Sequence, residues 1–242
     1  MTLNLKQMNT SMEERDAAGR ISFAVEQFGD GLVLLSSMQK TASVLMHMFH
    51  TLGLKNKILF VDTGYHFHET LLLRDQFIES YALPIVTLYP TLTPEQQEEQ
   101  YRCKLFKTSE GQPVCCDLRK GKPFLRYMKQ QKKTAVVGGL RRAEGQARGS
   151  IEVVAEDPRF SGYSVYPLVD WSQEDIDAYL LKHHVPVHSL HALGYPSIGC
   201  GCCTTPVLPG EDARAGRWRH LREGERTGPA YCGMNFTDGS GI

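Results

Sequence analysis

Five of the seven cysteines in this chain fall into two tight clusters whose spacing suits metal ligation. Cys115 and Cys116 are adjacent, and a Cys-Gly-Cys-Cys run begins at Cys200. Neighbouring thiolates strain to chelate one tetrahedral Zn²⁺, but they can reach two irons of a [4Fe–4S] cluster, which presents a separate metal to each thiolate. The Cys-x-x-Cys spacing favours Cys200 and Cys203 as the remaining ligands, although Cys202 could replace either neighbour. Structural zinc and unligated buried thiols are the alternatives.

A further cysteine, Cys232, lies in a Gly-flanked tail. A thiolate on such a tail can move, attack one partner and then present itself to another. By itself, this position is better explained as a spare thiol. Cys103 is interpreted as structural.

Basic residues are concentrated around the proposed site, where guanidinium groups suit phosphate or sulfate. They are Arg119, Lys120, Arg141, Arg142, Arg148, Arg214 and Arg217. Ser36 and Ser37 begin a connection from a strand to a helix, and the N–H groups and hydroxyls of such a connection bind anions. The connection lacks the Gly-x-x-x-x-Gly-Lys pattern of a nucleotide phosphate loop, so an ordinary turn is the alternative.

Short apolar runs alternate with helical patterns along the first three-quarters of the chain. The runs predict strands at residues 31–37, 57–64, 84–89, 134–138 and 165–169. The helical patterns cover residues 11–28, 41–52, 66–80, 94–101, 123–131 and 172–182, with Ser172 as the N-cap of the last. This alternation predicts an α/β fold with a parallel sheet covered by helices on both faces.

Ligands of such sheets bind at the carboxyl ends of the strands. This rule places Ser36, Ser37, Thr63, Gly64 and residues 138–142 along one edge. Residues 1–195 are predicted to form the nucleotide-binding part. Residues 196–242 are rich in Gly, Pro, Arg and Cys, and we expect them to form an irregular segment of the same domain, ordered by ligation and docking.

Composition excludes several classes of function. The 242 residues carry 27 Lys+Arg and 27 Asp+Glu, and this zero net charge argues against a large nucleic-acid footprint. No apolar run approaches the roughly 20 residues that span a bilayer, and no export signal is visible, so we expect a cytoplasmic protein. An odd number of cysteines argues against a disulfide framework.

Taken together, the motifs resemble those of the assimilatory sulfonucleotide reductases, specifically the iron–sulfur type that reduces adenylyl sulfate. The resemblance spans nearly the whole chain. Seven segments carry it in order: LLSSMQKTASVLMH, FVDTGYHFHETL, CCDLRKGKPFL, GGLRRAEGQARG, VPVHSLHALGYPSIGCGCCT, EDARAGRW and YCGMN. The resemblance implies a Rossmann-like fold of the adenine nucleotide alpha hydrolase type, with a modified phosphate loop that holds a phosphosulfate.

The resemblance also implies roles for individual residues. A [4Fe–4S] cluster would be held by Cys115, Cys116, Cys200 and Cys203, with Lys120 between cluster and substrate. The substrate would be bound by Ser36, Ser37, Thr63, Gly64, Arg141, Arg142, Arg148, Arg214 and Arg217. Cys232 would be the nucleophile.

The implied reaction is the reduction of adenylyl sulfate to sulfite and AMP, in sulfate assimilation and cysteine biosynthesis. The Cys232 thiolate would attack the sulfur, and thioredoxin or glutaredoxin would then release sulfite. Reduction of 3′-phosphoadenylyl sulfate, alone or as a second substrate, is the nearest alternative. An ATP-dependent adenylyl or thiolation enzyme and a non-catalytic zinc or iron–sulfur module are more distant ones. A homo-oligomer is a further implication of the resemblance.

Overall fold

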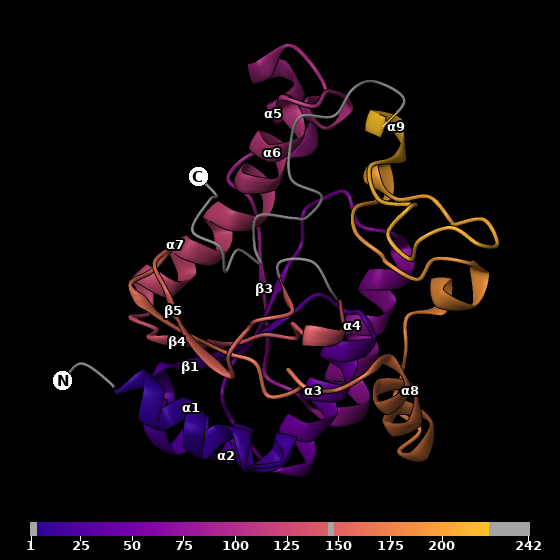
Figure 1. The fold of residues 1–242 in the computed structure, drawn as a ribbon. Coiled ribbons are helices and arrows are strands. Elements are labelled where there is room, and N and C mark those ends of the chain that lie inside the picture. Colours follow the sequence, from indigo (N-terminus) through magenta and orange to yellow (C-terminus); the bar gives the residue numbers. More distant parts are fainter. Residues whose placement is uncertain (1–3, 145–147, 223–242) are drawn as a thin grey trace.

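The computed structural model describes residues 4–144 and 148–222, and within them six strands form one sheet (Figure 1). The strand order is β3-β2-β1-β4-β6-β5, and only β5 runs antiparallel to its neighbour. The strands are β1 (Leu32–Ser36), β2 (Ile58–Val61), β3 (Ile85–Leu88), β4 (Ala135–Val137), β5 (Val154–Asp157) and β6 (Gly162–Val165). The predicted α/β fold with a mostly parallel sheet is therefore confirmed.

Alternate side chains of each central strand enter opposite cores, as the period of two requires. On one face, Leu32 and Leu34 of β1 pack with Ile58 and Phe60 of β2. Val33 lies on the opposite face in a second core. Because both faces are buried, these strands appear in the sequence as continuous apolar runs rather than as alternating ones.

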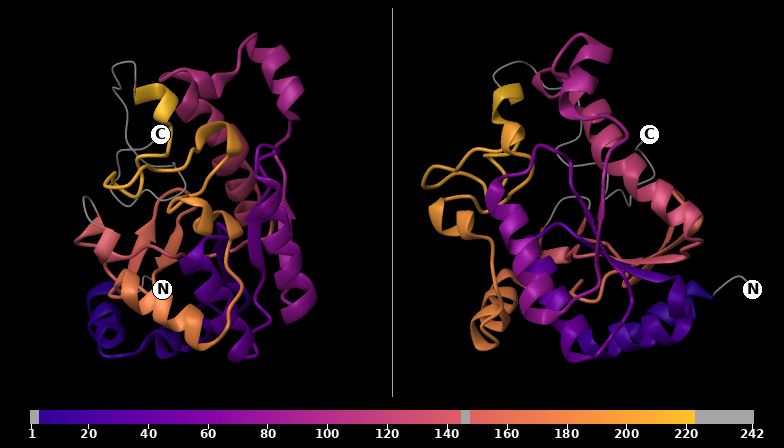
Figure 2. Two further views of the ribbon diagram at one scale, coloured as in Figure 1. Left: turned by 90° about the vertical axis from the view of Figure 1, so that its right-hand side faces the viewer. Right: turned by 180° about the vertical axis from the view of Figure 1, so that it is seen from behind.

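Helices cover the two faces unequally. The larger core is closed by α1 (Leu5–Glu13), α2 (Ala17–Phe28), α3 (Lys40–Thr51), α4 (His68–Tyr81) and α8 (Gln173–Lys182). The smaller core is closed by α7 (Lys122–Gln130), which contributes Phe124 and Met128. The short helices α5 (Pro94–Tyr101), α6 (Gly111–Cys116) and α9 (Arg219–Arg222) lie away from the sheet, at the opposite end of the molecule from α1 and α2 (Figures 1 and 2).

The prediction of one helix over residues 11–28 is wrong, because the chain forms two helices there. Asn4 caps α1 by accepting a hydrogen bond from the Gln7 N–H, and Asp16 caps α2 by accepting from the Gly19 N–H. The competing cap at Asp16 thus restarts the helix in the middle of the apolar pattern.

The prediction of a strand over residues 165–169 is also wrong. Only Val165 belongs to β6, which begins at Gly162 and forms an antiparallel hairpin with β5. The apolar residues after Val165 are buried in a turn, where the Val169 N–H donates to the Tyr166 carbonyl. Pro167 lies inside this turn and has no N–H for a strand ladder. The apolar run at residues 165–169 therefore reflects the burial of a turn and not a strand.

No helix in the described part of the chain is both long and apolar enough to cross a membrane.

Candidate active site

One face of a long helical segment forms the floor of a pocket. Helix α6 continues through a π-helical turn, Asp117–Gly121, directly into α7. Pocket-lining residues recur at helical spacing along this segment: Gln112, Cys115, Cys116, Arg119 and Lys120. Such spacing places them on one side of the helix. Wide turns of this type are frequent at functional sites.

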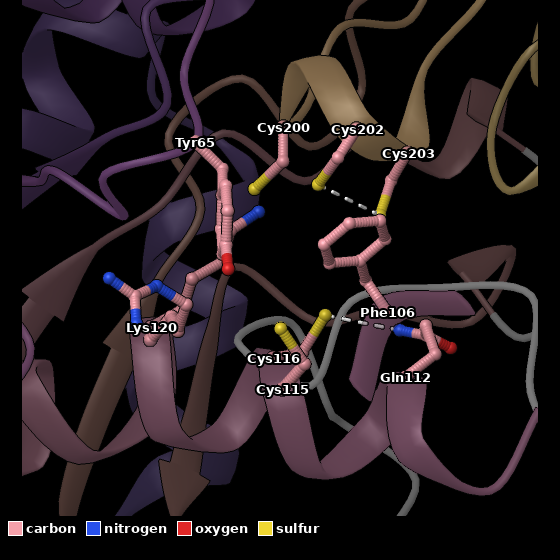
Figure 3. A pocket seen from close by; sticks show the side chains of 10 residues that line it. Tyr65, Phe106, Gln112, Cys115, Cys116, Lys120, Cys200, Cys202 and Cys203 are labelled. Atoms are coloured by element: carbon pink, nitrogen blue, oxygen red, sulfur yellow. Dashed lines mark hydrogen bonds between the residues drawn. The ribbon is translucent and has the colours of Figure 1, made fainter. Parts of the chain in front are cut away.

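The Cys200–Cys203 segment forms the opposite side of the pocket (Figure 3). It is a single 3-10 turn in which the Cys203 N–H donates to the Cys200 carbonyl over 2.9 Å. The loop after β2 holds this turn, because the Gly201 N–H donates to the Tyr65 carbonyl over 2.7 Å. A single bridge also pairs His66 with Cys200.

Trp218 anchors the same turn from the other side. Its side chain is buried, with the residue 1 % exposed, and its backbone N–H donates to the Cys203 carbonyl over 2.8 Å. The Arg217 guanidinium stacks 4.6 Å from the indole ring and donates to the Ile198 carbonyl. A side chain at Gly199 would place its Cβ 2.3 Å from this guanidinium. Glycine at position 199 therefore leaves room for the arginine in this packing.

The structure thus brings both cysteine groups together, although they are far apart in the chain. Cys115 and Cys116 face Cys200, Cys202 and Cys203 across the pocket, and the Lys120 side chain points into the same space (Figure 3). The other lining residues are Tyr65, Phe106, Gln112 and Arg119. Cys103 lines no part of this pocket and is exposed.

The donor set is of the kind that an iron–sulfur cluster takes, with thiols on two walls of one pocket. In the described part of the chain, no three His, Cys, Asp or Glu side chains are grouped closely enough to hold one metal ion. A zinc ion needs four ligands at about 2.0–2.3 Å from one centre. A [4Fe–4S] cluster instead takes one thiolate at each iron, so its ligands are spread around a larger body. Thiols on opposite walls of one pocket match this second requirement.

Side-chain donors surround the sulfur atoms. The Thr63 hydroxyl lies 3.3 Å from the Cys200 Sγ. On the helical side, Gln97 donates to the Cys115 Sγ over 3.6 Å, and Gln112 donates to the Cys116 Sγ over 3.1 Å. The Cys202 Sγ lies 3.6 Å from the Cys203 Sγ.

Burial and charge act on these thiols in opposite directions. A hydrogen bond from Cys202 lowers the pKa of the Cys200 thiol well below its ordinary value, although burial opposes ionisation. The positive charge of Lys120 lowers the pKa of Cys200 further. On the other side of the pocket, burial raises the pKa of the Cys115 thiol, and the Gln97 hydrogen bond only partly offsets this effect. Of these two thiols, Cys200 is thus the one whose ionisation the surroundings favour.

Arg119 is a buried cation next to the cysteines. Its side chain is 2 % exposed, and it donates to the Thr63 carbonyl and to the Gln97 side-chain carbonyl, the latter over 3.0 Å. Its guanidinium also stacks 4.9 Å from the Tyr65 ring. Gly64 has φ +71°, and a Cβ there would lie 3.0 Å from the Arg119 guanidinium. Gly64 therefore serves both the turn and the close packing of this arginine.

The residues predicted to bind substrate at the ends of β1 and β2 lie on neighbouring strands. Ser36 is buried, and its hydroxyl accepts from the Met38 N–H over 3.2 Å. Ser37 is exposed. Thr63 is buried, and its hydroxyl accepts from the Tyr65 N–H and contacts the Cys200 Sγ. Thr63 therefore links the strand edge to the cysteine pocket.

The predicted substrate arginines that follow β4 are bonded to other parts of the protein. Arg141 is buried and donates to the Trp171 carbonyl and the Gln173 side chain. Arg142 pairs with Glu13 of α1 and donates to the Ile151 carbonyl. A separate pair joins Arg148 to Glu144.

The two predicted arginines of the C-terminal segment converge on one hydroxyl. Arg214 and Arg217 each donate to the Ser197 Oγ, over 3.5 and 3.4 Å. The predicted nucleophile, Cys232, lies outside the described residues.

Sequence reasoning missed two glutamines that contact the cysteines. Gln112 could have been found, because it lies four residues before Cys116 and so shares its helix face. Gln97 has no such signal, since its contact with Cys115 depends on how α5 packs against α6. Arg119 was assigned to an anion pocket, whereas its buried contacts are with protein carbonyls.

Comparison with known proteins identifies the family to which this arrangement is similar. The model of the phosphoadenosine phosphosulfate reductase domain matches residues 31–206. An adenosine 5′-phosphosulfate reductase of Halalkalibacterium halodurans is 37% identical over 235 residues, which cover 96% of this chain and 97% of the relative. A protein of the same name from Shouchella clausii is 36% identical, covering 95% of this chain and 92% of the relative.

A solved structure supports the fold assignment. The phosphoadenylyl-sulfate reductase of Candida auris, in complex with phosphate, superposes with a TM-score of 0.75. The match covers 85% of this chain and 99% of that chain at 22% identity. At this level of identity the likeness concerns the fold alone.

Proposed function

The chain belongs to the phosphoadenosine phosphosulfate reductase family, and on this premise we propose that it reduces adenylyl sulfate to sulfite and AMP. The relatives of 36–37% identity that match almost the full length of the chain are named for this reaction. The observation that carries the proposal is the pocket in which Cys115 and Cys116 meet Cys200 and Cys203 beside Lys120.

We propose that these four cysteines hold a [4Fe–4S] cluster. Their thiols come from two walls of one pocket, as a cluster with one thiolate at each iron requires. When bound, the cluster supplies a fixed local charge next to Lys120. The remaining chemistry belongs to side chains of the protein.

The covalent step is assigned to Cys232. Its thiolate attacks the sulfur of adenylyl sulfate, a new S–S bond forms, and the bond from sulfur to the phosphate oxygen of AMP breaks. AMP leaves with the electron pair of the broken bond. Cationic side chains of the pocket stabilise the negative charge that develops on the leaving phosphate, and Lys120 is the first candidate. The product on the enzyme is an S-sulfocysteine.

A dithiol protein such as thioredoxin or glutaredoxin completes the reaction. One of its thiolates attacks the Cys232 sulfur and displaces sulfite, so that a mixed disulfide joins the two proteins. Its second thiolate then resolves this disulfide and restores the Cys232 thiol. The two electrons that reduce the sulfur therefore come from the dithiol, which leaves as a disulfide.

The proposal is tested by intact-protein mass spectrometry after the enzyme is mixed with adenylyl sulfate without reductant. We expect a mass increase of one SO₃ group that thioredoxin removes, with release of sulfite. Cys232→Ser is expected to show neither the adduct nor turnover, whereas Cys103→Ser should show both. Turnover by Cys232→Ser would contradict the assigned nucleophile.

A further inference from the structure

The helical segment from Gly111 to Gln130 forms one wall of the cysteine pocket, here called the helical wall. Two buried glutamines contact its adjacent cysteines, Cys115 and Cys116. Gln112 is 6 % exposed, and its Nε2 donates to the Cys116 Sγ over 3.1 Å (Figure 3). Gln97 is 2 % exposed, and its Nε2 donates to the Cys115 Sγ over 3.6 Å. Each member of the cysteine pair thus receives one hydrogen bond from a neutral amide.

The orientation of the Gln97 amide is determined by a second contact. Its Oε1 accepts a hydrogen bond from Arg119 over 3.0 Å. A guanidinium can only donate, so the oxygen of the amide must face the arginine. The NH₂ group of Gln97 is therefore left facing Cys115. Arg119 is itself held by the Thr63 and Leu92 carbonyls.

Packing alone does not explain carboxamides at these positions. A buried amide without a partner costs about 1–3 kcal/mol, and a methionine of similar length would fill the same space without that cost. A thiolate sulfur is a better acceptor than a thiol, because hydrogen bonds to charged groups are stronger. The two amides are thus best matched to cysteines that are ionised, as metal ligands are.

We propose that Gln97 and Gln112 are positioning residues for the iron–sulfur centre, each donating one hydrogen bond to a different ligand sulfur of the adjacent pair. The inference rests on the cluster assigned under the proposed function. Such donors orient metal ligands and withdraw negative charge from them. They therefore weaken the iron–sulfur bond, favour the reduced form of a cluster and raise its reduction potential. Because the hydrogen bond from Gln112 is shorter than that from Gln97, we expect Gln112 to have the larger effect on the iron–sulfur centre.

The experiment compares Gln112→Met and Gln97→Met with the wild type after anaerobic purification. Gln100→Met is the matched control, because Gln100 is an exposed glutamine on the same helix as Gln97. Three quantities are measured: iron per chain, the resonance Raman frequency of the iron–cysteine stretch, and the rate of iron transfer to a chelator. None of them depends on turnover.

We expect Gln112→Met to raise the stretching frequency, because no donor then weakens the iron–sulfur bond. It should also speed iron loss by about tenfold, the lower end of what such residues contribute, because the Cys116 side chain is no longer held in the orientation that binds iron. Gln97→Met should change both quantities in the same direction by less. Gln100→Met should match the wild type. If Gln112→Met takes up no iron, Gln112→His restores a donor and is expected to load the cluster. Failure of that variant to load would overturn the proposal.

Unchanged frequencies and release rates in both Met variants, with normal iron content, would overturn this inference and leave the proposed function intact. A wild-type protein that binds no iron would overturn the cluster assignment and this inference together.

Discussion

Cys115 and Cys116 lie on one continuous helical segment, whereas Cys200 and Cys203 lie in a segment held by a single 3-10 turn and isolated bridges. The helical wall uses local hydrogen bonds and a repeated spacing to direct its side chains. The segment around Cys200–Cys203, here called the irregular wall, depends on long-range contacts. Examples are the hydrogen bond from the Gly201 N–H to the Tyr65 carbonyl and the stacking of Arg217 on Trp218. We therefore expect substitutions in the helical wall to change the chemistry first, and substitutions in the irregular wall to change the structure first.

The largest effect is expected from Lys120→Ala in the helical wall. Lys120 points into the pocket, so its loss should lower kcat for sulfite release by about 10- to 100-fold while the iron content is retained. Lys122→Ala is the control, because that exposed lysine pairs with Asp117. Kinetics and iron analysis of both variants check the expectation, and a normal rate for Lys120→Ala would remove its role.

The next effect should be structural and lie in the irregular wall. Gly199→Ala would place a Cβ against the Arg217 guanidinium, and such overpacking costs about 1–3 kcal/mol. Gly201→Ala is the matched control, since its nearest new contact is an ordinary 3.5 Å. Thermal unfolding should show a lower Tm for Gly199→Ala only. Equal Tm values for the two variants would show that the packing of Arg217 does not hold this wall.

A smaller, pH-dependent effect is expected where the chain enters the irregular wall. His188 is 1 % exposed, accepts from the Leu190 N–H and contacts the Thr70 hydroxyl, and burial lowers its pKa to about 4. In the unfolded chain the His188 imidazole takes up a proton near pH 6.5. The free energy of unfolding should therefore be highest above pH 6.5 and decrease from there to about pH 4.

The measurement for this prediction is the free energy of unfolding against pH for the wild type and His188→Gln. His188→Gln should show a flatter curve between pH 6.5 and 4. An identical slope in the two proteins would contradict the assignment.

The smallest effect is expected from Cys202→Ala. The 3-10 turn directs all three of its cysteines toward the pocket, but the ligand spacing assigns Cys200 and Cys203. Cys202→Ala should keep the wild-type iron content, and Cys203→Ala should lose it. Loss of iron in Cys202→Ala, with retention in Cys203→Ala, would exchange the two roles.

The contrast between the walls also explains what the sequence could predict. The central strands and most helices follow from apolar periodicity and caps, such as Ser172 at the start of α8. The cysteine groups were recognisable from residue type and spacing. The packing that joins them was not, because Gly199, Arg217 and Trp218 meet through long-range contacts without a period. The β5–β6 hairpin was missed for a related reason, since burial of a turn resembles a buried strand.

The most direct test of the account measures substrate preference and iron in one anaerobic sample. Sulfite production with reduced thioredoxin is compared for adenylyl sulfate and its 3′-phosphorylated form, and the visible spectrum and iron content are recorded on the same protein. We expect a brown protein with about four irons per chain and a clear preference for adenylyl sulfate. A colourless protein that prefers the 3′-phosphorylated substrate would contradict it.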